Sequence, residues 1–221
     1  MAAKKRECRL IIFAKAPISG RVKTRLIPSL GAKAAMCLHQ KLIVHSLVKA
    51  RQVRVGPIDL WCAPSTAHPF FLCCQKKFRA GLHSQPRGDL GRRMAFALRT
   101  TLERASSALL IGTDAPSLTE GDLREAAKAL ARGMDAVVGP AEDGGYVLIG
   151  LRRFAPELFR GISWGTGCVL AETYERLHRL GWQWHELPKR WDVDRPEDVE
   201  RLRTEGLLKG RHQGCENCFE D

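Results

Sequence analysis

The sequence lacks any apolar run long enough to cross a membrane or to form the core of an export signal. The first such run, residues 10–14, is far shorter than the roughly 20 residues of a membrane helix or the roughly 7–15 of a signal-peptide core. We therefore expect a cytoplasmic protein without a membrane partner, whose eight cysteines are mostly reduced thiols. His212, Cys215 and Cys218 have metal-like spacing, but they offer at most three of the four ligands that a zinc site needs.

Acidic residues are outnumbered by basic ones, 24 to 36, which gives a formal net charge of +12. Such an excess favours anionic partners, among them nucleotides, phosphorylated metabolites and nucleic acid. Nucleic-acid-binding proteins usually interleave aromatic with basic residues or show a known module. Here only Trp182, Trp184 and Trp191 cluster, in a buried or edge context, so nucleic acid is the less favoured partner.

Apolar periodicity predicts alternating strands and helices. Strands are expected at residues 9–14, 58–62, 108–112, 136–139 and 146–151, with an extended segment at 183–187. Helices are expected at residues 31–53, 90–103, from 119 onward, at 166–180 and at 196–204. This order predicts an α/β fold, a three-layer α/β/α sandwich around a mostly parallel sheet. A single domain would cover residues 9–207, with residues 1–8 and 208–221 as polar termini.

The first candidate site is the basic loop after the first strand, where the carboxyl ends of parallel strands bind ligands. It contains Lys15, Gly20, Arg21, Lys23, Thr24 and Arg25. Cationic side chains and backbone N–H groups there could hold a polyphosphate, although the glycine spacing is not that of a Walker A loop. A solvated basic loop is the alternative, and its place in the chain favours phosphate binding.

Three acidic segments follow. Asp114 ends a buried strand, where it could bind Mg²⁺ or form a turn before Pro116. Asp192 and Asp194 would project to one side of an extended segment, as a second metal contact or as a helix cap.

The third acidic segment is a turn that contains Asp143, Gly144 and Gly145. Its glycines would allow close approach of the backbone to a ligand, or simply a tight turn between strands. The spacing does not decide between these two roles.

Five ordered motifs carry a family resemblance. They are Phe13-Ala14-Lys15-Ala16-Pro17 with Gly20-Arg21-Val22-Lys23-Thr24-Arg25-Leu26, Gly88-Asp89-Leu90-Gly91-x-Arg93-Met94, Ile111-Gly112-Thr113-Asp114-x-Pro116, Gly139-Pro140-x-x-Asp143-Gly144-Gly145-Tyr146-x-Leu148-Ile149-Gly150-Leu151 and Asp192-Val193-Asp194-x-Pro196-Glu197-Asp198. The chain resembles bacterial nucleotide-diphospho-sugar transferases and arsenosugar-biosynthesis-type glycosyltransferases over about residues 9–207. That group is similar to the molybdenum-cofactor and phospholactate guanylyltransferase families.

The resemblance implies a GT-A-like, Rossmann-type nucleotide-binding fold. It places a triphosphate on Lys15, Arg21, Lys23 and Arg25, and Mg²⁺ or Mn²⁺ on Asp114 and Asp194, with Asp192 adjacent. Asp114, Lys23 and Arg21 would then be the catalytic residues, and Gly20, Thr24 and the 143–145 turn would bind substrate.

Two positions depart from the pattern of these relatives. Arg195 stands where relatives usually have Thr, which removes a helix cap worth about 0.5–2 kcal/mol. Lys15-Ala16-Pro17 replaces the Gly-Gly loop of the guanylyltransferases, so the resemblance does not identify the base.

Two reactions fit such a site. In nucleotidyl transfer an acceptor phosphate attacks the α-phosphorus of a nucleoside triphosphate; in glycosyl transfer an acceptor hydroxyl attacks the sugar carbon of a nucleotide sugar. The basic loop suits a triphosphate better, so we favour nucleotidyl transfer to a small phosphorylated acceptor. No general base is evident, because His83, His178 and His185 lie in segments that give no reason to place them at the site.

Overall fold

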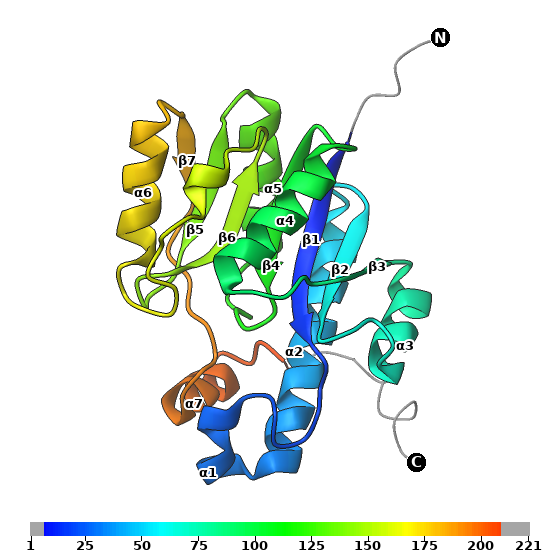
Figure 1. Ribbon diagram of the computed structural model, residues 1–221. Coiled ribbons are helices and arrows are strands. Elements are labelled where there is room, and N and C mark those ends of the chain that lie inside the picture. Colours follow the sequence, from blue (N-terminus) through cyan, green and yellow to red (C-terminus); the bar gives the residue numbers. More distant parts are fainter. Residues whose placement is uncertain (1–6, 209–221) are drawn as a thin grey trace.

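A seven-stranded sheet forms the centre of the computed structural model, which describes residues 7–208 (Figure 1). Its strands are β1 (Cys8–Lys15), β2 (Ile58–Ala63), β3 (Gly81–Ser84), β4 (Ser107–Gly112), β5 (Ala136–Pro140), β6 (Tyr146–Leu151) and β7 (Trp184–Glu186). Their order across the sheet is β3-β2-β1-β4-β6-β5-β7. Strand β6 runs antiparallel to β4 and β5, and the other neighbours pair in parallel, so the predicted mostly parallel sheet is confirmed.

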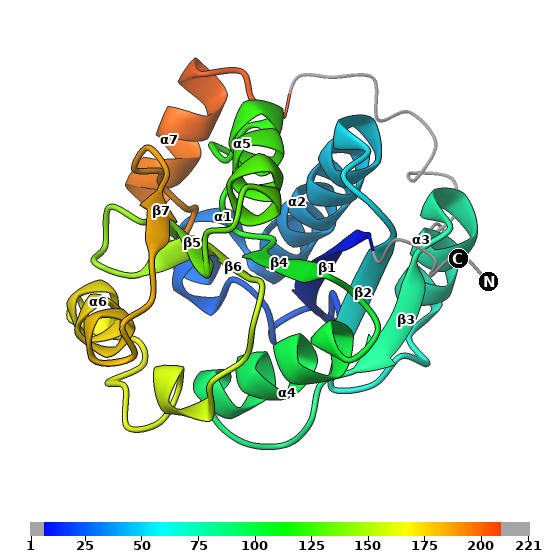
Figure 2. The same ribbon diagram turned by 90° about the horizontal axis from the view of Figure 1, so that it is seen from above.

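Helices cover both faces of the sheet. They are α1 (Ile27–Leu30), α2 (Ala32–Val53), α3 (Pro69–Phe78), α4 (Leu90–Leu102), α5 (Glu120–Ala131), α6 (Val169–Arg179) and α7 (Pro196–Thr204), with short 3₁₀ turns at Thr24–Leu26 and Pro156–Leu158. Helices α2 and α5 lie on one face, and α4 and α6 on the other (Figure 2). In β1, Leu10 and Ile12 pack toward α2, whereas Ile11 packs toward α4, as the two-residue period of a strand requires. The three-layer α/β/α fold is therefore confirmed.

Two elements lie in a stretch for which the sequence pattern predicted none. Helix α3 begins with Pro69 after His68, whose ring nitrogen accepts a hydrogen bond from the Phe70 amide. Strand β3 has four residues, none of them fully buried, at the edge of the sheet. A short, half-exposed edge strand has little apolar periodicity, which is why the pattern does not reveal it.

A separate apolar cluster joins the basic loop to the end of the chain. Leu26, Leu42, Trp191, Val193 and Val199 pack together between α2 and α7. Because these side chains come from segments far apart in sequence, their burial holds the loop after β1 against the segment before α7. In Figure 1 α1 and α7 accordingly lie side by side below the sheet.

The N-terminus of α7 confirms the expected loss of a cap, because Arg195 makes no side-chain cap hydrogen bond. The Asp198 carboxylate accepts hydrogen bonds from the backbone N–H groups of Asp194 (2.9 Å) and Arg195 (2.7 Å). A carboxylate within the first turn therefore still stabilises the start of the helix. At the start of α5, Thr119 and Asp122 form a capping box with both reciprocal hydrogen bonds.

No helix within residues 7–208 is long and apolar enough to span a membrane. The candidate ligands His212, Cys215 and Cys218 lie outside the described residues.

Candidate active site

Two neighbouring pockets meet at Asp114, at the carboxyl ends of β1 and β4. Their volumes are about 450 Å³ for the first and about 280 Å³ for the second. The first is lined by Phe13, Ala14, Lys15, Arg21, Val22, Lys23, Thr24, Arg25, His39, Gln85, Leu90, Arg93, Gly112, Thr113, Asp114 and Asp194. The second is lined by Phe13, Leu90, Met94, Leu110, Gly112, Asp114, Ala115, Ala141, Asp143, Gly145, Tyr146, Val147, Trp164, Gly165, Thr166, Val169 and Asp192. Every predicted site residue except Gly20 and Gly144 lines one of them.

The basic loop folds back so that Lys23 reaches the acidic residues. The chain leaves β1 at Lys15 and turns at Gly20, whose φ is 77°. Lys23 itself has φ 47°, a left-handed conformation that is uncommon for a residue with a side chain and is often found at functional sites. Its side chain is 4 % exposed and points into the site.

The Lys23 ammonium group lies among three oxygen atoms from two other segments. It is 2.5 Å from the carbonyl oxygen of Val193, 2.8 Å from Asp114 Oδ1 and 3.6 Å from Asp194 Oδ1. Arg25 Nη1 is 3.1 Å from the other oxygen of the Asp194 carboxylate. The two aspartates that the resemblance assigned to a metal thus surround a cation.

The oxygen atoms around Lys23 are also of the kind that a divalent metal ion takes as ligands. Within residues 7–208 no group of three or more His, Cys, Asp or Glu side chains is arranged to hold a metal by itself. Mg²⁺, however, takes oxygen ligands, and it is usually bound by one or two carboxylates together with substrate phosphates and water. The oxygens of Asp114 and Asp194 already hold a positive charge, so the donor set fits such an ion.

Asp192 adds a third carboxylate on the side of the second pocket. Its neighbours Trp191 and Val193 are buried, so Asp192 and Asp194 both face outward as the two-residue period predicted, but toward different pockets. Burial, followed by the negative charges of Asp143, Asp194 and Asp114, raises the pKa of Asp192 to about 6, although the charge of Lys23 acts in the opposite direction. Such crowding of carboxylates is typical of a place that binds cations.

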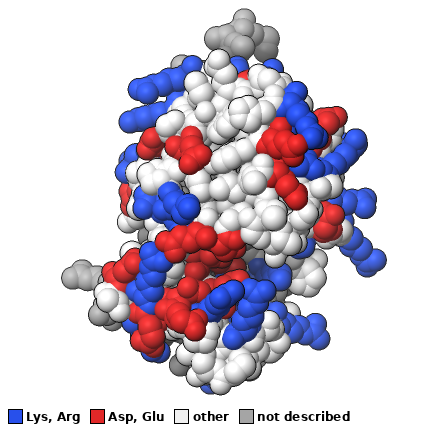
Figure 3. Space-filling view, turned by 90° about the vertical axis from the view of Figure 1, so that its left-hand side faces the viewer, with Lys and Arg blue, Asp and Glu red and all other residues white. Residues whose placement is uncertain are grey.

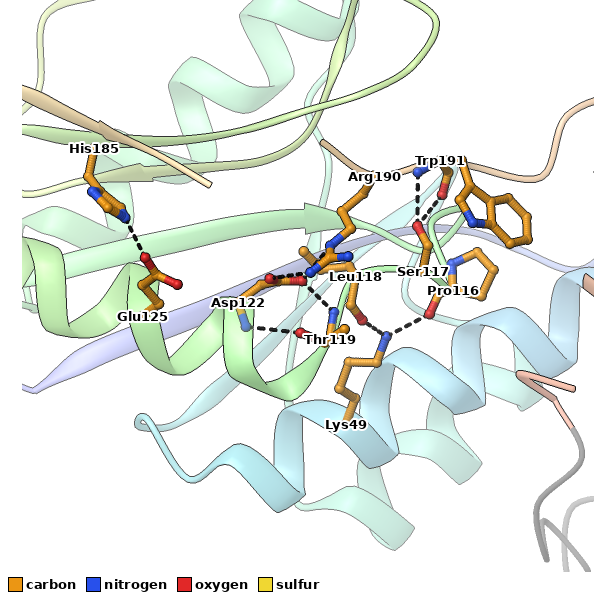
Figure 4. A network of polar contacts seen from close by, with 10 residues as sticks. All are labelled: Lys49, Pro116, Ser117, Leu118, Thr119, Asp122, Glu125, His185, Arg190 and Trp191. Atoms are coloured by element: carbon orange, nitrogen blue, oxygen red, sulfur yellow. Dashed lines mark hydrogen bonds and ion pairs between the residues drawn. The ribbon is translucent and has the colours of Figure 1, made fainter. Parts of the chain in front are cut away.

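A polar network holds the two acidic segments together behind the site (Figure 4). Arg190 forms a two-pronged ion pair with Asp122, with N···O distances of 2.8 and 2.7 Å. The Ser117 hydroxyl donates to the Trp191 carbonyl (2.5 Å) and accepts from the Trp191 amide (2.9 Å). The loop that carries Asp114 is thereby fixed to the segment that carries Asp192 and Asp194.

Lys49 supports the same loop from α2. It is 8 % exposed, and its amine donates to the carbonyl oxygens of Pro116 (3.1 Å) and Leu118. Burial lowers its pKa to about 8, although the charges of Asp122 and Glu120 act in the opposite direction. Lys49 is therefore a supporting residue of the site rather than part of its lining.

The two predicted glycines that line neither pocket have conformational roles. Gly20 supplies the positive φ of the basic loop. Gly144, with φ 85°, lies so close to Gly167 that a Cβ atom would sit 2.2 Å from the Gly167 carbonyl oxygen. Next to it, Asp143 Oδ1 accepts a hydrogen bond from the Gly145 amide (2.8 Å), so this tight turn forms one wall of the second pocket.

His39 is a site residue that the sequence pattern did not reveal. Its ring is 4 % exposed on α2; Nε2 is 3.0 Å from the Lys15 carbonyl, and Nδ1 is 4.0 Å from Asp114 Oδ1 without a hydrogen-bond partner. Burial lowers its pKa, which favours the neutral ring. Its spacing from Leu42 and Ile43 places it on the apolar face of α2, where the pattern cannot distinguish it from a core histidine.

His83, His178 and His185, which no sequence feature places at the site, line neither pocket. His83 Nε2 is 3.1 Å from Asp59, His185 Nε2 is 2.7 Å from Glu125, and His178 packs edge-on against Trp184.

Gln85, Arg93 and Trp164 also line the pockets. Arg93 reaches the first pocket from α4, where its guanidinium Nη1 lies 3.4 Å from Gln85 Oε1. Trp164 closes the second pocket, and its indole lies over Gly91, where a Cβ atom would come within 2.4 Å of the indole nitrogen. On the face of the molecule that carries α6 and α7, acidic side chains gather around a hollow and basic ones flank them (Figure 3).

Solved structures share this fold. A putative nucleotide-diphospho-sugar transferase from Desulfovibrio desulfuricans G20 is similar with 28 % sequence identity and a TM-score of 0.83, covering 95 % of this chain and 90 % of that one. CMP:2-keto-3-deoxy-manno-octonic acid synthetase complexed with CTP is similar in fold, with 13 % identity, a TM-score of 0.59 and coverage of 92 % and 100 %.

A glycosyl-transferring enzyme has the fold as well. Glucosyl-3-phosphoglycerate synthase from Mycobacterium tuberculosis, in complex with Mn²⁺, UDP and glucosyl-3-phosphoglycerate, has 12 % identity and a TM-score of 0.52, with coverage of 92 % and 77 %. These likenesses confirm the predicted GT-A-like fold.

No curated protein matches the sequence. Residues 46–166, more than half of the chain, match the family described as "Uncharacterized protein conserved in bacteria" (DUF2064). The chain belongs to this DUF2064 family.

Proposed function

We propose that the chain transfers a nucleotidyl group from a nucleoside triphosphate to a small acceptor, with Mg²⁺ or Mn²⁺ held by Asp114 and Asp194. The observation that carries this proposal is the ion contact between Lys23 and those two carboxylates. It joins a loop with further cations to a pair of oxygen ligands inside one pocket. Phosphate oxygens and a divalent cation are the partners that such neighbours suit.

The cations of the first pocket are enough for a triphosphate. Lys15, Arg21, Arg25 and Arg93 line it together with Lys23. Asp114 and Asp194 would hold a divalent ion, which would supply positive charge to the phosphate groups. Lys23 would then be free to leave the carboxylates and, with Arg21, to offset the charge that develops on departing pyrophosphate.

The proposed step begins when an acceptor oxygen forms a bond to the α-phosphorus. The bond from that phosphorus to the oxygen bridging to the β-phosphate breaks, and pyrophosphate leaves with this oxygen. A proton lost by an acceptor hydroxyl would go to a carboxylate of the second pocket or to water. Asp114 lies between the two pockets, where donor and acceptor would meet.

Glycosyl transfer from a nucleotide-diphospho-sugar is the second candidate. It is favoured by the likeness to the Desulfovibrio desulfuricans protein and to the glucosyl-3-phosphoglycerate synthase. The basic loop favours the first reaction, because the five cations of the pocket exceed what a diphosphate needs for neutralisation.

A thermal-shift screen distinguishes the two reactions. Nucleoside triphosphates and nucleotide sugars are each added with and without Mg²⁺ or Mn²⁺. A ligand at a hundred times its dissociation constant stabilises the folded state by about 2.7 kcal/mol, which raises the melting temperature by roughly 5–10 °C. We expect metal-dependent stabilisation by triphosphates. Stabilisation by sugar nucleotides alone would support glycosyl transfer, and no stabilisation by either class would contradict the proposal.

A further inference from the structure

We infer that the second pocket binds an uncharged, polyhydroxylated ring, such as a sugar or cyclitol without a phosphate group. The inference rests on the proposed function in that this ring would be the acceptor of the transferred group. It also revises the phosphorylated acceptor that the sequence suggested.

Charge is the first argument. Asp114, Asp143 and Asp192 line the second pocket, and within residues 7–208 no Lys, Arg or His contributes to its lining. A phosphate group there would face carboxylates without a basic partner, even if one divalent ion neutralised part of their charge. Hydroxyl groups, in contrast, donate short and strong hydrogen bonds to carboxylates.

The aromatic side chains are the second argument. Tyr146 and Trp164 meet edge to face, with ring centroids 6.4 Å apart. The Tyr146 hydroxyl is directed at the sulfur of Met94 (3.9 Å), so this corner of the pocket presents an apolar surface. The electron-rich face of an aromatic ring attracts the positively polarised C–H groups of a saturated ring. An aromatic surface beside carboxylates therefore suits a ring that is apolar on its faces and hydroxylated on its edge.

The wall that carries Trp164 is held in place before any ligand arrives. The Glu172 carboxylate accepts hydrogen bonds from the backbone N–H and the hydroxyl of Ser163, both at 2.8 Å. The Thr166 hydroxyl donates to the Ser163 carbonyl (2.7 Å), and the Leu170 amide donates to the Gly144 carbonyl (2.9 Å). The loop between the 3₁₀ turn at Pro156–Leu158 and α6 is thus tied both to α6 and to the 143–145 turn.

Size and position complete the argument. A volume of about 280 Å³ lies near the lower end of small-molecule pockets, which are roughly 300–1,000 Å³, so the ligand is about as large as one ring. Phe13, Leu90, Gly112 and Asp114 line both pockets. A hydroxyl of the bound ring would therefore lie next to a phosphate in the first pocket.

Saturation-transfer NMR on the full chain with Mg²⁺ tests this inference. The probes are glucose, galactose and myo-inositol, each compared with its monophosphate, in the presence of the triphosphate found in the thermal-shift screen. We expect at least one neutral ring to bind and no monophosphate to bind more tightly than its parent. Tighter binding of the monophosphates, or no binding of any ring while the nucleotide binds, would overturn the inference and leave the proposed function intact.

Variants locate the binding. Trp164→Ala should weaken ring binding by about tenfold, and Asp143→Asn should weaken it as well, with nucleotide binding unchanged. Phe96→Ala is the matched control, because Phe96 is an exposed aromatic residue of α4 outside both pockets. An undiminished signal in Trp164→Ala would show that the ring binds elsewhere and would overturn the inference.

A gain of function and a competition sharpen the test. Thr166→Lys places a cation in the lining and should make the monophosphates bind better than the neutral rings.

Displacement of the ring by a sugar nucleotide but not by the corresponding nucleoside diphosphate would show that the ring occupies the place of a donor sugar. That result would support a neutral ring in the second pocket and would contradict nucleotidyl transfer. Simultaneous binding of the ring and the triphosphate would support both the neutral ring and nucleotidyl transfer. Failure of all nucleotides to bind would refute the proposed function alone, since ring binding can be measured without them.

Discussion

The two pockets share Phe13, Leu90, Gly112 and Asp114, and they differ in the charge of the rest of their lining. The first is lined by five Lys and Arg side chains, and the second by carboxylates and aromatic rings, with no basic residue among the described residues of the chain. This charge pattern would attract a polyphosphate to the first pocket and repel it from the second. Under the proposed function, the group to be transferred would then lie near Asp114, where the two surfaces meet.

The pockets also differ in how the chain builds them. Most cations of the first come from one continuous segment, residues 15–25. The second combines the 143–145 turn, Trp164 and Asp192 with side chains of β4 and α4. A polyphosphate-binding surface can thus be encoded locally, whereas the second pocket exists only after distant segments have packed.

Lys23→Met should have the largest effect and should act on the first pocket alone. Removing a charged contact of about 1.5–3 kcal/mol weakens triphosphate binding by roughly ten- to a hundredfold. Without metal the variant should also melt at a lower temperature, because Asp114 and Asp194 lose the ammonium between them. Isothermal titration calorimetry and thermal melts with and without Mg²⁺ measure the two effects. The exposed Lys33, replaced in the same way, is the control; equal losses in both variants would contradict the role of Lys23.

Arg190→Met should damage both pockets, because Arg190 ties the segment bearing Asp192 and Asp194 to α5. The variant leaves Asp122, whose side chain is 5 % exposed, without its ion-pair partner. With the pair partly open to solvent, we expect a loss of about 2–3 kcal/mol in the free energy of unfolding and weaker binding of nucleotide and ring alike. Urea denaturation gives the first quantity. Arg179→Met removes an exposed pair on α6 and should change stability by less than about 1 kcal/mol; loss of binding in one pocket only would argue against the shared support.

Because Lys49 supports the loop that carries Asp114, we expect the free energy of unfolding to depend on the protonation of its amine. Its pKa of about 8 in the folded protein lies below the ordinary 10.5, so between these values the unfolded chain binds more protons than the folded one. Stability should therefore rise with pH from about 8 to about 10.5, by about 1–3 kcal/mol more in the parent than in Lys49→Met. The neutral amine can still donate to its carbonyl partners. Urea unfolding of both proteins at pH 7.5 and pH 10 measures the difference; parallel curves would mean that Lys49 titrates normally.

Gly91→Ala should have the smallest effect and should act on the second pocket alone. The new methyl group would collide with the Trp164 indole and displace it. Ring binding should fall by a few-fold, on the scale of one weakened aromatic contact, while triphosphate binding stays the same. Gly121→Ala on α5 is the control, because a Cβ there meets no atom closer than 3.4 Å. A loss of nucleotide affinity in Gly91→Ala would show that the pockets are not independent.

The contrast between the pockets also explains what the sequence could reveal. The alternation of buried strands and amphipathic helices predicted the three layers, and the positions of Lys23 and Asp114 after two strands placed them at one edge of the sheet. Parallel topology makes that inference possible, since it brings the carboxyl ends of strands together. The short edge strand β3 and helix α3 carried too weak a pattern to be predicted.

Residues that act through packing could not be found in this way. His39 lies on the apolar face of a helix, and Trp164 follows a loop without periodicity; only the folded chain shows that both face the site. The same holds for Asp198, whose carboxylate caps α7 where the sequence suggested a missing cap at Arg195.

Asp114→Asn provides the most direct test of metal-dependent nucleotide binding, the central claim. Asp114 is half-exposed, so the fold should persist, and Glu125→Gln, at an exposed residue paired with His185, is a matched control for the lost charge. Calorimetric titration of Mg²⁺ and triphosphate into each protein should show tight binding to the parent and the control. For Asp114→Asn the account predicts a loss of about ten- to a hundredfold, on the scale of a charged contact. Equal affinity in all three proteins would contradict it.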